Sequence, residues 1–399
     1  MNLINHDYMR VKNLSNVFEL IRSSEGLLTK RELQNKSGLC WSTISDSVAE
    51  LIKNGFIVDA EFQTSKVGRP AKTYDINPNN NLLIGVDINP ESYRAVVIDM
   101  QCRVIYSTTR MMVDNDRESV IASAKAIIYD VISQSGINIE SVLGIGFALT
   151  GVVDTVNGVS LYSHHYKNWD NVPIKEIFEE EFQIPVLIEH DPNCLAIAEL
   201  NIGIGKNYNH IILIRSSFGI GMSFLIDGKI YTGSAGHAGE FGHICIDRKG
   251  PQCLCGRRGC LEAYSSISGI AQRYRETMEK KGVIFSERNS NADFMLIQKL
   301  ANLAATGDED ALFLFDKAAD TLGYSIGNLI SVLAPDIVIL GGRIVDYSPL
   351  YGKKLTETAL DICWPHHNAK IVFSTLKANA TAIGAASLFI QSKIWETKL

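Results

Sequence analysis

The chain lacks several features that would place it in a special class of protein. Its 399 residues contain no apolar run that approaches the length of a membrane-spanning helix. The first residues, MNLINHDYMRVKN, lack the basic start, apolar core and cleavage site of a secretory signal. Eight cysteines in a chain of this size do not match the disulfide framework of a small secreted domain. These absences predict a globular cytoplasmic protein with no membrane partner.

A strong excess of charge is also missing. The net charge is −6, and residues 1–80 carry ten Lys and Arg against nine Asp and Glu, a balance of +1. The remaining residues carry 28 against 35, a balance of −7. Any contact with nucleic acid must therefore come from the amino-terminal part. With 46% hydrophobic residues, the chain can form two or three domains with buried cores.

The first eighty residues predict three helices and a hairpin. Apolar residues recur at helical spacing between Val11 and Ser24, and Thr29 with Glu32 forms a capping-box pattern ahead of a second helix. A third helix begins near Trp41 and ends at Asn54, and the strands FIVDAEF and TYDI follow around the turn SKVGRPAK. Three helices and a β-hairpin describe a winged helix-turn-helix, which predicts double-stranded operator DNA as a partner.

The predicted contacts with DNA lie on the third helix and on the wing. In a winged helix-turn-helix, the second helix of the pair enters the major groove, and the wing reaches the backbone or the minor groove. The residues assigned to these roles are Trp41, Ser42, Thr43, Ser45, Lys66, Gly68, Arg69, Pro70 and Lys72. The low charge of this region keeps a protein-binding winged helix open as the alternative.

From residue 82 the pattern changes to alternating strands and helices. LLIGVDI and YRAVVID form one strand–turn–strand pattern, and HIILIRS and MSFLIDGKI form another more than a hundred residues later. This repetition predicts a duplicated α/β body with a cleft between two lobes. We expect the winged helix over residues 1–80, the first lobe over 81–200 and the second over 201–378. The helix of residues 379–399 is expected to pack back on the first lobe.

Three cysteines lie within the eight residues CLCGRRGC. Cys253, Cys255 and Cys260 are soft ligands of the kind that zinc binds in a tetrahedron, and the intervening glycines permit the sharp turn that a C-x-C pair needs. Redox-active cysteines are the alternative, but their usual spacing is C-x-x-C. A fourth ligand would make the site structural, and the open candidates for it are His237, His243 and Cys245.

The stretch GSAGHAGEFGHI followed by CLCGRRGCLE resembles the signature of the ROK family, which groups bacterial sugar kinases with sugar-responsive transcriptional repressors. The resemblance covers residues 82 to about 390 and implies an actin-like and hexokinase-like body with a ribonuclease H-like fold. With a winged helix in front, the chain is similar to repressors of the xylose-repressor and N-acetylglucosamine-repressor type. The resemblance also implies one structural zinc ion per chain, held by His243 and the three cysteines.

The resemblance implies a sugar site as well. Family members hold sugar hydroxyls with an aspartate, a glutamate and a histidine of the GExGH motif, and a glutamate after the last cysteine. These positions fall on Asp191, Glu240, His243 and Glu262. His165 stands where relatives carry an asparagine that contacts the sugar; a residue of an exposed loop is the alternative for it. The expected ligand is a sugar or a sugar phosphate.

The kinase motifs of the family are altered in this chain. The first phosphate-binding turn, DxGxT, reads here as Asp87-Ile88-Asn89-Pro90-Glu91. Asn89 replaces a glycine, Pro90 removes an N–H donor, and Glu91 adds negative charge where ATP would bring its own. The second turn carries the bulky Phe218.

These changes predict a repressor without kinase activity, in which Asp191 is a vestigial base. Symmetric operators favour a homodimer or a homotetramer. We expect the protein to repress genes of carbohydrate uptake or catabolism, xylose metabolism among them, until a sugar binds. The alternative is an ATP-dependent sugar kinase with a fused DNA-binding head.

Overall fold

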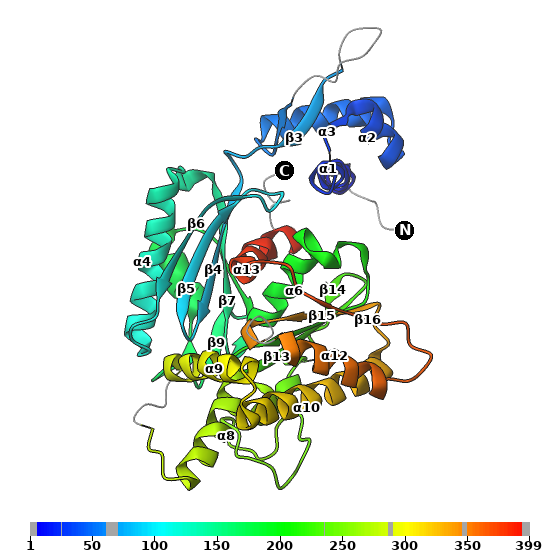
Figure 1. Ribbon diagram of the computed structural model, residues 1–399. Helices are drawn as coiled ribbons and strands as arrows, with labels where there is room; N and C mark the ends of the chain where they lie inside the picture. Colours follow the sequence, from blue (N-terminus) through cyan, green and yellow to red (C-terminus); the bar gives the residue numbers. More distant parts are fainter. Residues whose placement is uncertain are drawn as a thin grey trace.

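Figure 1 shows the computed structural model of the chain, which describes residues 6–24, 26–60, 71–234, 236–285, 290–344 and 349–392. Three helices and a small antiparallel sheet form a head at one end of the molecule, and two larger sheets with their helices form the body. No helix among the described residues is long and apolar enough to cross a lipid bilayer.

The head contains three helices and a three-stranded sheet in the order β1-β3-β2. Its elements are α1 (His6–Arg22), β1 (Leu28–Thr29), α2 (Lys30–Ser37), α3 (Trp41–Lys53), β2 (Ile57–Asp59) and β3 (Thr73–Ile76). The predicted capping box begins α2, because the hydroxyl of Thr29 accepts from the N–H of Glu32 at 3.3 Å and the Glu32 carboxylate accepts from the N–H of Thr29 at 2.7 Å. Gly38 ends α2 with a φ of 70°.

The body is built on two five-stranded sheets that repeat one topology. The first sheet has the order β11-β7-β4-β5-β6, and the second has the order β14-β13-β12-β15-β16. In each, an antiparallel hairpin is extended on one side by two parallel strands. The two strand–turn–strand patterns of the sequence are these hairpins.

The strands of the first sheet are β4 (Leu82–Asn89), β5 (Ser92–Ile98), β6 (Val104–Met111), β7 (Val142–Leu149) and β11 (Val186–His190). Those of the second are β12 (Ile211–Ser216), β13 (Ile220–Ile226), β14 (Lys229–Ile230), β15 (Ile337–Gly341) and β16 (Lys370–Phe373). The central strands β4 and β7 are buried along their whole length, which explains why they appear as continuous apolar runs in the sequence.

Helices cover both sheets (Figure 1). They are α4 (Arg117–Ser135), α5 (Ile174–Phe182), α6 (Asp191–Ile202), α7 (Glu262–Ser265), α8 (Ile267–Lys280), α9 (Ser290–Ala305), α10 (Glu309–Leu333), α12 (Pro349–Ile362) and α13 (Ala380–Gln391). A third sheet, of the short strands β8 (Val152–Asp154), β9 (Val159–Tyr162) and β10 (Asp170–Val172), was not predicted.

Helix α13 lies directly on the backbone of the first sheet. A Cβ atom at Gly85 of β4 would lie 1.9 Å from the carbonyl oxygen of Ala382, and one at Gly146 of β7 would lie 1.9 Å from that of Ala385. The two glycines are paired across the sheet, so together they form a seat for the helix. One cluster of buried side chains continues from this helix, through Phe389 and Ile390, into the core of the head.

Helix α6 connects the body to the head by direct contact. Its first residue, Asp191, follows the end of β11, whereas near its last turn Asn201 accepts a hydrogen bond from the Arg22 guanidinium of α1 at 3.4 Å. The carbonyl of Arg22 accepts from the Gln101 side-chain amide of the first lobe at 3.1 Å. The end of α1 is therefore held by two parts of the body.

Candidate functional site

A cavity of about 490 Å³ is lined by residues of both halves of the body, at the carboxyl ends of β4, β7, β11 and β12. We call it the cleft. Its volume is in the usual range for a site that takes a small molecule. The structure brings all five predicted sugar-site residues to its wall: His165, Asp191, Glu240, His243 and Glu262.

Two adjacent histidines, His164 and His165, form part of the wall, with ring centroids 3.9 Å apart. The pKa of His165 is lowered to about 3, first by burial and then by the neighbouring His164 and Arg215. Burial also lowers the pKa of His164. Both rings are therefore neutral at pH 7, and each offers one donor and one acceptor, which suits hydroxyl groups.

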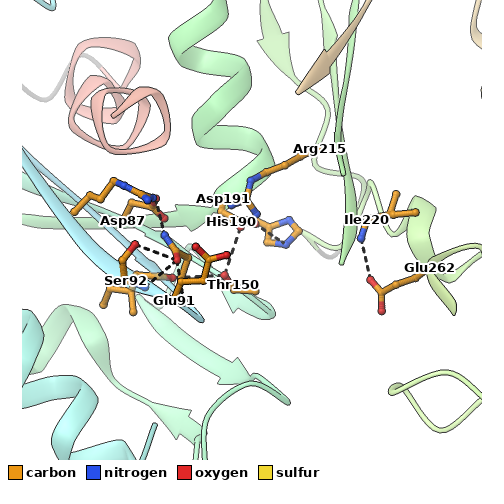
Figure 2. Close-up of polar contacts among 12 residues, drawn as sticks. Asp87, Glu91, Ser92, Thr150, His190, Asp191, Arg215, Ile220 and Glu262 are labelled. Atoms are coloured by element: carbon orange, nitrogen blue, oxygen red, sulfur yellow. Dashed lines mark hydrogen bonds and ion pairs between the residues drawn. The ribbon is translucent and has the colours of Figure 1, made fainter. Parts of the chain in front are cut away.

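Asp191 is buried at the start of α6 and is held by several neighbours (Figure 2). Its Oδ2 atom forms an ion pair with Arg215 and accepts from the Thr150 hydroxyl at 3.4 Å. Its Oδ1 atom lies 3.6 Å from His190 Nε2. Sequence reasoning missed Arg215, although it is the single charged residue in the otherwise apolar stretch HIILIRS.

The altered first turn also lies in the cleft, where Asn89, Pro90 and Glu91 contribute to the wall. The Asn89 side chain accepts from the N–H groups of Glu91 and Ser92, each at 3.1 Å, and donates to Asp87 at 3.2 Å (Figure 2). Asn89 thus stabilises the turn through its own side chain.

Two further carboxylates of this region are paired with arginines. Glu91 forms an ion pair with Arg343, which follows β15 in the other half of the body, and burial raises the pKa of Glu91. Asp87 lies 3.5 Å from Arg94. Burial raises the pKa of Asp87, and the positive charges of Arg215 and Arg94 oppose this effect.

The structure also gathers the side chains of His243, Cys253, Cys255 and Cys260. One ligand atom from each lies within 4.8 Å of the others, with Cys255 Sγ and Cys260 Sγ 3.7 Å apart and Cys253 Sγ 3.8 Å from His243 Nδ1. Around a tetrahedral ion with metal–sulfur bonds of about 2.3 Å, neighbouring sulfurs are about 3.8 Å apart. This donor set therefore fits a metal ion.

The other fourth-ligand candidates are placed differently. The thiol of Cys245 contacts the carbonyl of Arg258 at 3.7 Å, and neither it nor His237 belongs to the metal-ligand group that the described residues form. His243 Nε2 lies 4.0 Å from Glu240. Glu262 accepts from the N–H of Ile220 at 3.0 Å (Figure 2). Its other oxygen lies 3.8 Å from Cys253 Sγ. The cysteine cluster thus borders the cleft.

The predicted DNA-contacting residues are only partly described. Trp41 is 52% exposed at the start of α3, with Ser42 exposed beside it and Thr43 and Ser45 partly exposed. Lys72 is exposed and forms an ion pair with Asp59 at 2.5 Å. The wing-tip residues Lys66, Gly68, Arg69 and Pro70 lie outside the described residues.

The sequence profile of the ROK family matches residues 83–392. The chain belongs to the ROK family. This membership confirms the predicted resemblance, and the matched residues are those of the body and exclude the head.

Known proteins similar to this ROK chain include regulators and kinases. The xylose repressor of Caldicellulosiruptor bescii is 25% identical over 98% of this chain and 98% of its own. The glucokinase of Thermotoga maritima is 30% identical over 77% of this chain and 96% of its own. A solved structure described as a ROK family transcriptional regulator, homologous to the Escherichia coli Mlc protein, has a TM-score of 0.79 at 23% identity and covers 96% of both chains. This last likeness shows the fold.

Proposed function

We propose that the protein is a sugar-responsive transcriptional regulator of the cytoplasm. It represses genes of carbohydrate uptake or catabolism and is released from operator DNA when a sugar binds in the cleft. The observation that carries this proposal is the extent of similarity: the xylose repressor aligns with 98% of the chain, whereas the glucokinase aligns with 77%. The part without a kinase counterpart has the size of the head.

The head supports the proposal through its shape and its exposed residues. Three helices and a small sheet are the elements of a winged helix, in which α3 would be the recognition helix. Its exposed Trp41 and Ser42 would meet base edges, and the wing, with Lys66, Arg69 and Lys72, would meet phosphates. Two or more heads on a homodimer or homotetramer would read a symmetric operator.

The cleft supports binding without phosphoryl transfer. Glu91 lies in the turn where a kinase would receive ATP phosphates and is paired with Arg343 from beyond β15, and the second turn carries the buried Phe218. Transfer of a phosphoryl group depends almost entirely on positioning and on stabilising negative charge. We therefore assign the body the role of a sensor, in which Asp191, Glu240, His243 and Glu262 hold sugar hydroxyls, with His165 beside them.

We assign one zinc ion per chain to His243, Cys253, Cys255 and Cys260. Zinc with four protein ligands crosslinks a loop and does no chemistry of its own. Ligation through His243 Nδ1 would leave Nε2 protonated and directed toward Glu240, so that the imidazole donates in the cleft. The cluster would thereby position both His243 and the neighbouring Glu262.

The sugar signal would reach the head through α6. Its first residue lies in the cleft and its last turn contacts Arg22, so closure of the two halves around a sugar moves a helix that the head touches. The sugar needs only a higher affinity for the closed state to shift the population. That shift would change the placement of the recognition helices.

The test begins by selecting duplexes from a random DNA library with the purified protein, followed by a gel shift with the selected sequence. We expect salt-dependent binding that one of a panel of pentoses and hexoses weakens at least tenfold. Selected DNA whose binding responds to no sugar or sugar phosphate would contradict the sensor. Formation of ADP from ATP and any sugar of the panel would favour the kinase instead.

A further inference from the structure

Each positive side chain of the cleft is already bonded to a carboxylate of the protein. Three arginines line the cleft among the described residues, and their partners are Asp87 for Arg94, Asp191 for Arg215 and Glu91 for Arg343. The partner carboxylates are between 2% and 7% exposed. The carboxylates are therefore shielded from water, whereas the arginine side chains are 12–30% exposed. A charge interaction that is partly buried is screened less than one at the surface.

Several backbone donors that could bind an anion are also occupied or missing. The amino-terminal end of α6 faces the cleft, but Asp191 places a carboxylate at this position and Pro192 has no N–H. In the second turn, the N–H of Ile220 donates to Glu262 at 3.0 Å. Ser217 donates its N–H to the carbonyl of Gly219 at 2.9 Å.

The balance of charge in the wall is negative. Three guanidinium groups face the carboxylates of Glu91, Asp191, Glu240 and Glu262, with Asp87 behind them. A phosphate group with nearly two negative charges would approach arginines whose charge a carboxylate already balances, and it would be repelled by that carboxylate. A sugar hydroxyl, in contrast, can donate to a carboxylate that remains paired with its arginine, because each carboxylate has several acceptor sites.

We propose that Glu91 and Asp191 act as built-in substitutes for phosphate, so that the cleft accepts uncharged sugars and excludes sugar phosphates and nucleotides. The Glu91–Arg343 pair is the specificity determinant that can be tested alone, because Glu91 is outside the residues assigned to sugar hydroxyls. Removal of its carboxylate leaves Arg343 free to bind an anion. This inference rests on the proposed function, since it names the ligand class of the same cleft.

The first measurement is calorimetric titration of the full chain with xylose, glucose and N-acetylglucosamine, and with glucose 6-phosphate, N-acetylglucosamine 6-phosphate and inorganic phosphate. We expect binding of at least one uncharged sugar, at least 100-fold tighter than any of the phosphates. Tighter binding of a sugar phosphate than of its parent sugar would overturn the inference.

The second measurement compares two variants that each remove one negative charge from the cleft. In Glu91→Gln, Arg343 loses its partner, and we expect inorganic phosphate to bind at least tenfold tighter than to the unaltered chain. In Glu240→Gln the removed carboxylate is 47% exposed and has no arginine partner among the described residues, so phosphate affinity should stay within threefold. Glu91→Gln combined with Arg343→Gln should lose the gained affinity.

The two proposals can fail separately. If no sugar of either kind binds, the proposed function fails, and the phosphate titration of Glu91→Gln still decides the inference. If Glu91→Gln keeps the circular dichroism and the thermal midpoint of the unaltered chain without gaining phosphate affinity, the inference fails while the sensor stands.

Discussion

Replacement of Gly146 by alanine tests the contact between α13 and the first sheet. The new Cβ atom would lie 1.9 Å from the carbonyl oxygen of Ala385 and 2.5 Å from its carbonyl carbon, so the helix must withdraw by about 1 Å. Because both partners are backbone, no change of rotamer can relieve the clash. Overpacking of this kind costs about 1–3 kcal/mol, and we expect the upper half of this range.

An opposing effect acts through the unfolded chain. Alanine restricts the unfolded state more than glycine does, which stabilises a protein by about 0.4–1 kcal/mol. The clash exceeds this gain, so the net loss of unfolding free energy should be about 2 kcal/mol, or about thirtyfold in the folding equilibrium. The assay is equilibrium unfolding in urea, followed by circular dichroism and by the fluorescence of the four tryptophans, of which Trp169 is buried.

The matched control for this experiment is Gly26→Ala. A Cβ atom at Gly26 meets nothing within 4 Å, so this variant should equal or slightly exceed the stability of the unaltered chain. Equal urea midpoints for Gly146→Ala and Gly26→Ala would refute the close approach of α13 and the reasoning built on it.

Three further predictions concern the metal, the recognition helix and the contact between α6 and the head. Metal analysis should give about one zinc ion per chain. Cys255→Ser should lose both zinc and sugar affinity, whereas the control Cys363→Ser should keep both. A metal-free Cys255→Ser with normal sugar affinity would contradict the proposal that the zinc site positions His243 and Glu262. Hydrogen bonds with Ser42 and Thr43 lower the pKa of the exposed Cys40 thiol to about 7. Alkylation of Cys40 should therefore reach half its maximal rate near pH 7, more than one pH unit below the midpoint for an ordinary thiol. Bound operator DNA should block this alkylation. Unchanged labelling in the presence of DNA would place the interface elsewhere. Arg22→Ala should leave unchanged the affinity for sugar without DNA and the affinity for DNA without sugar. It should reduce the effect of sugar on DNA binding about two- to fivefold. An unchanged effect would show that the Arg22–Asn201 contact does not couple the cleft to the head.

Elements with a strong local pattern were predictable from the sequence. The capping box of Thr29 and Glu32 is a short-range contact, and it begins α2 as predicted. The hairpins of both sheets appear as apolar runs around a turn, because β4, β5 and β12 are buried along almost their whole length and β13 is partly buried. The edge strand β6 was missed because most of its residues are exposed and show no apolar run.

The site was predictable as far as its residue types belong to a motif. His243 and the three cysteines come together as the family resemblance implies. The arginine pairs were not predictable, because Arg215, Arg343 and their carboxylate partners lie far apart in the sequence and meet only when the two halves of the body are assembled. The sequence showed that the first phosphate turn carries the negative charge of Glu91, but it could not show that Arg343 is the residue paired with it.

The seat of α13 also affects the order in which the chain can fold during its synthesis. Strands β4 and β7 are made early, yet the helix that covers their glycines emerges from the ribosome only after the entire second half of the body. The same helix adds Phe389 and Ile390 to the cluster that reaches into the head. A chain interrupted before α13 therefore lacks the part of this cluster that α13 supplies. We therefore expect the head to reach its full stability only after α13 has been made, so that the folding of the head depends on the distant end of the body.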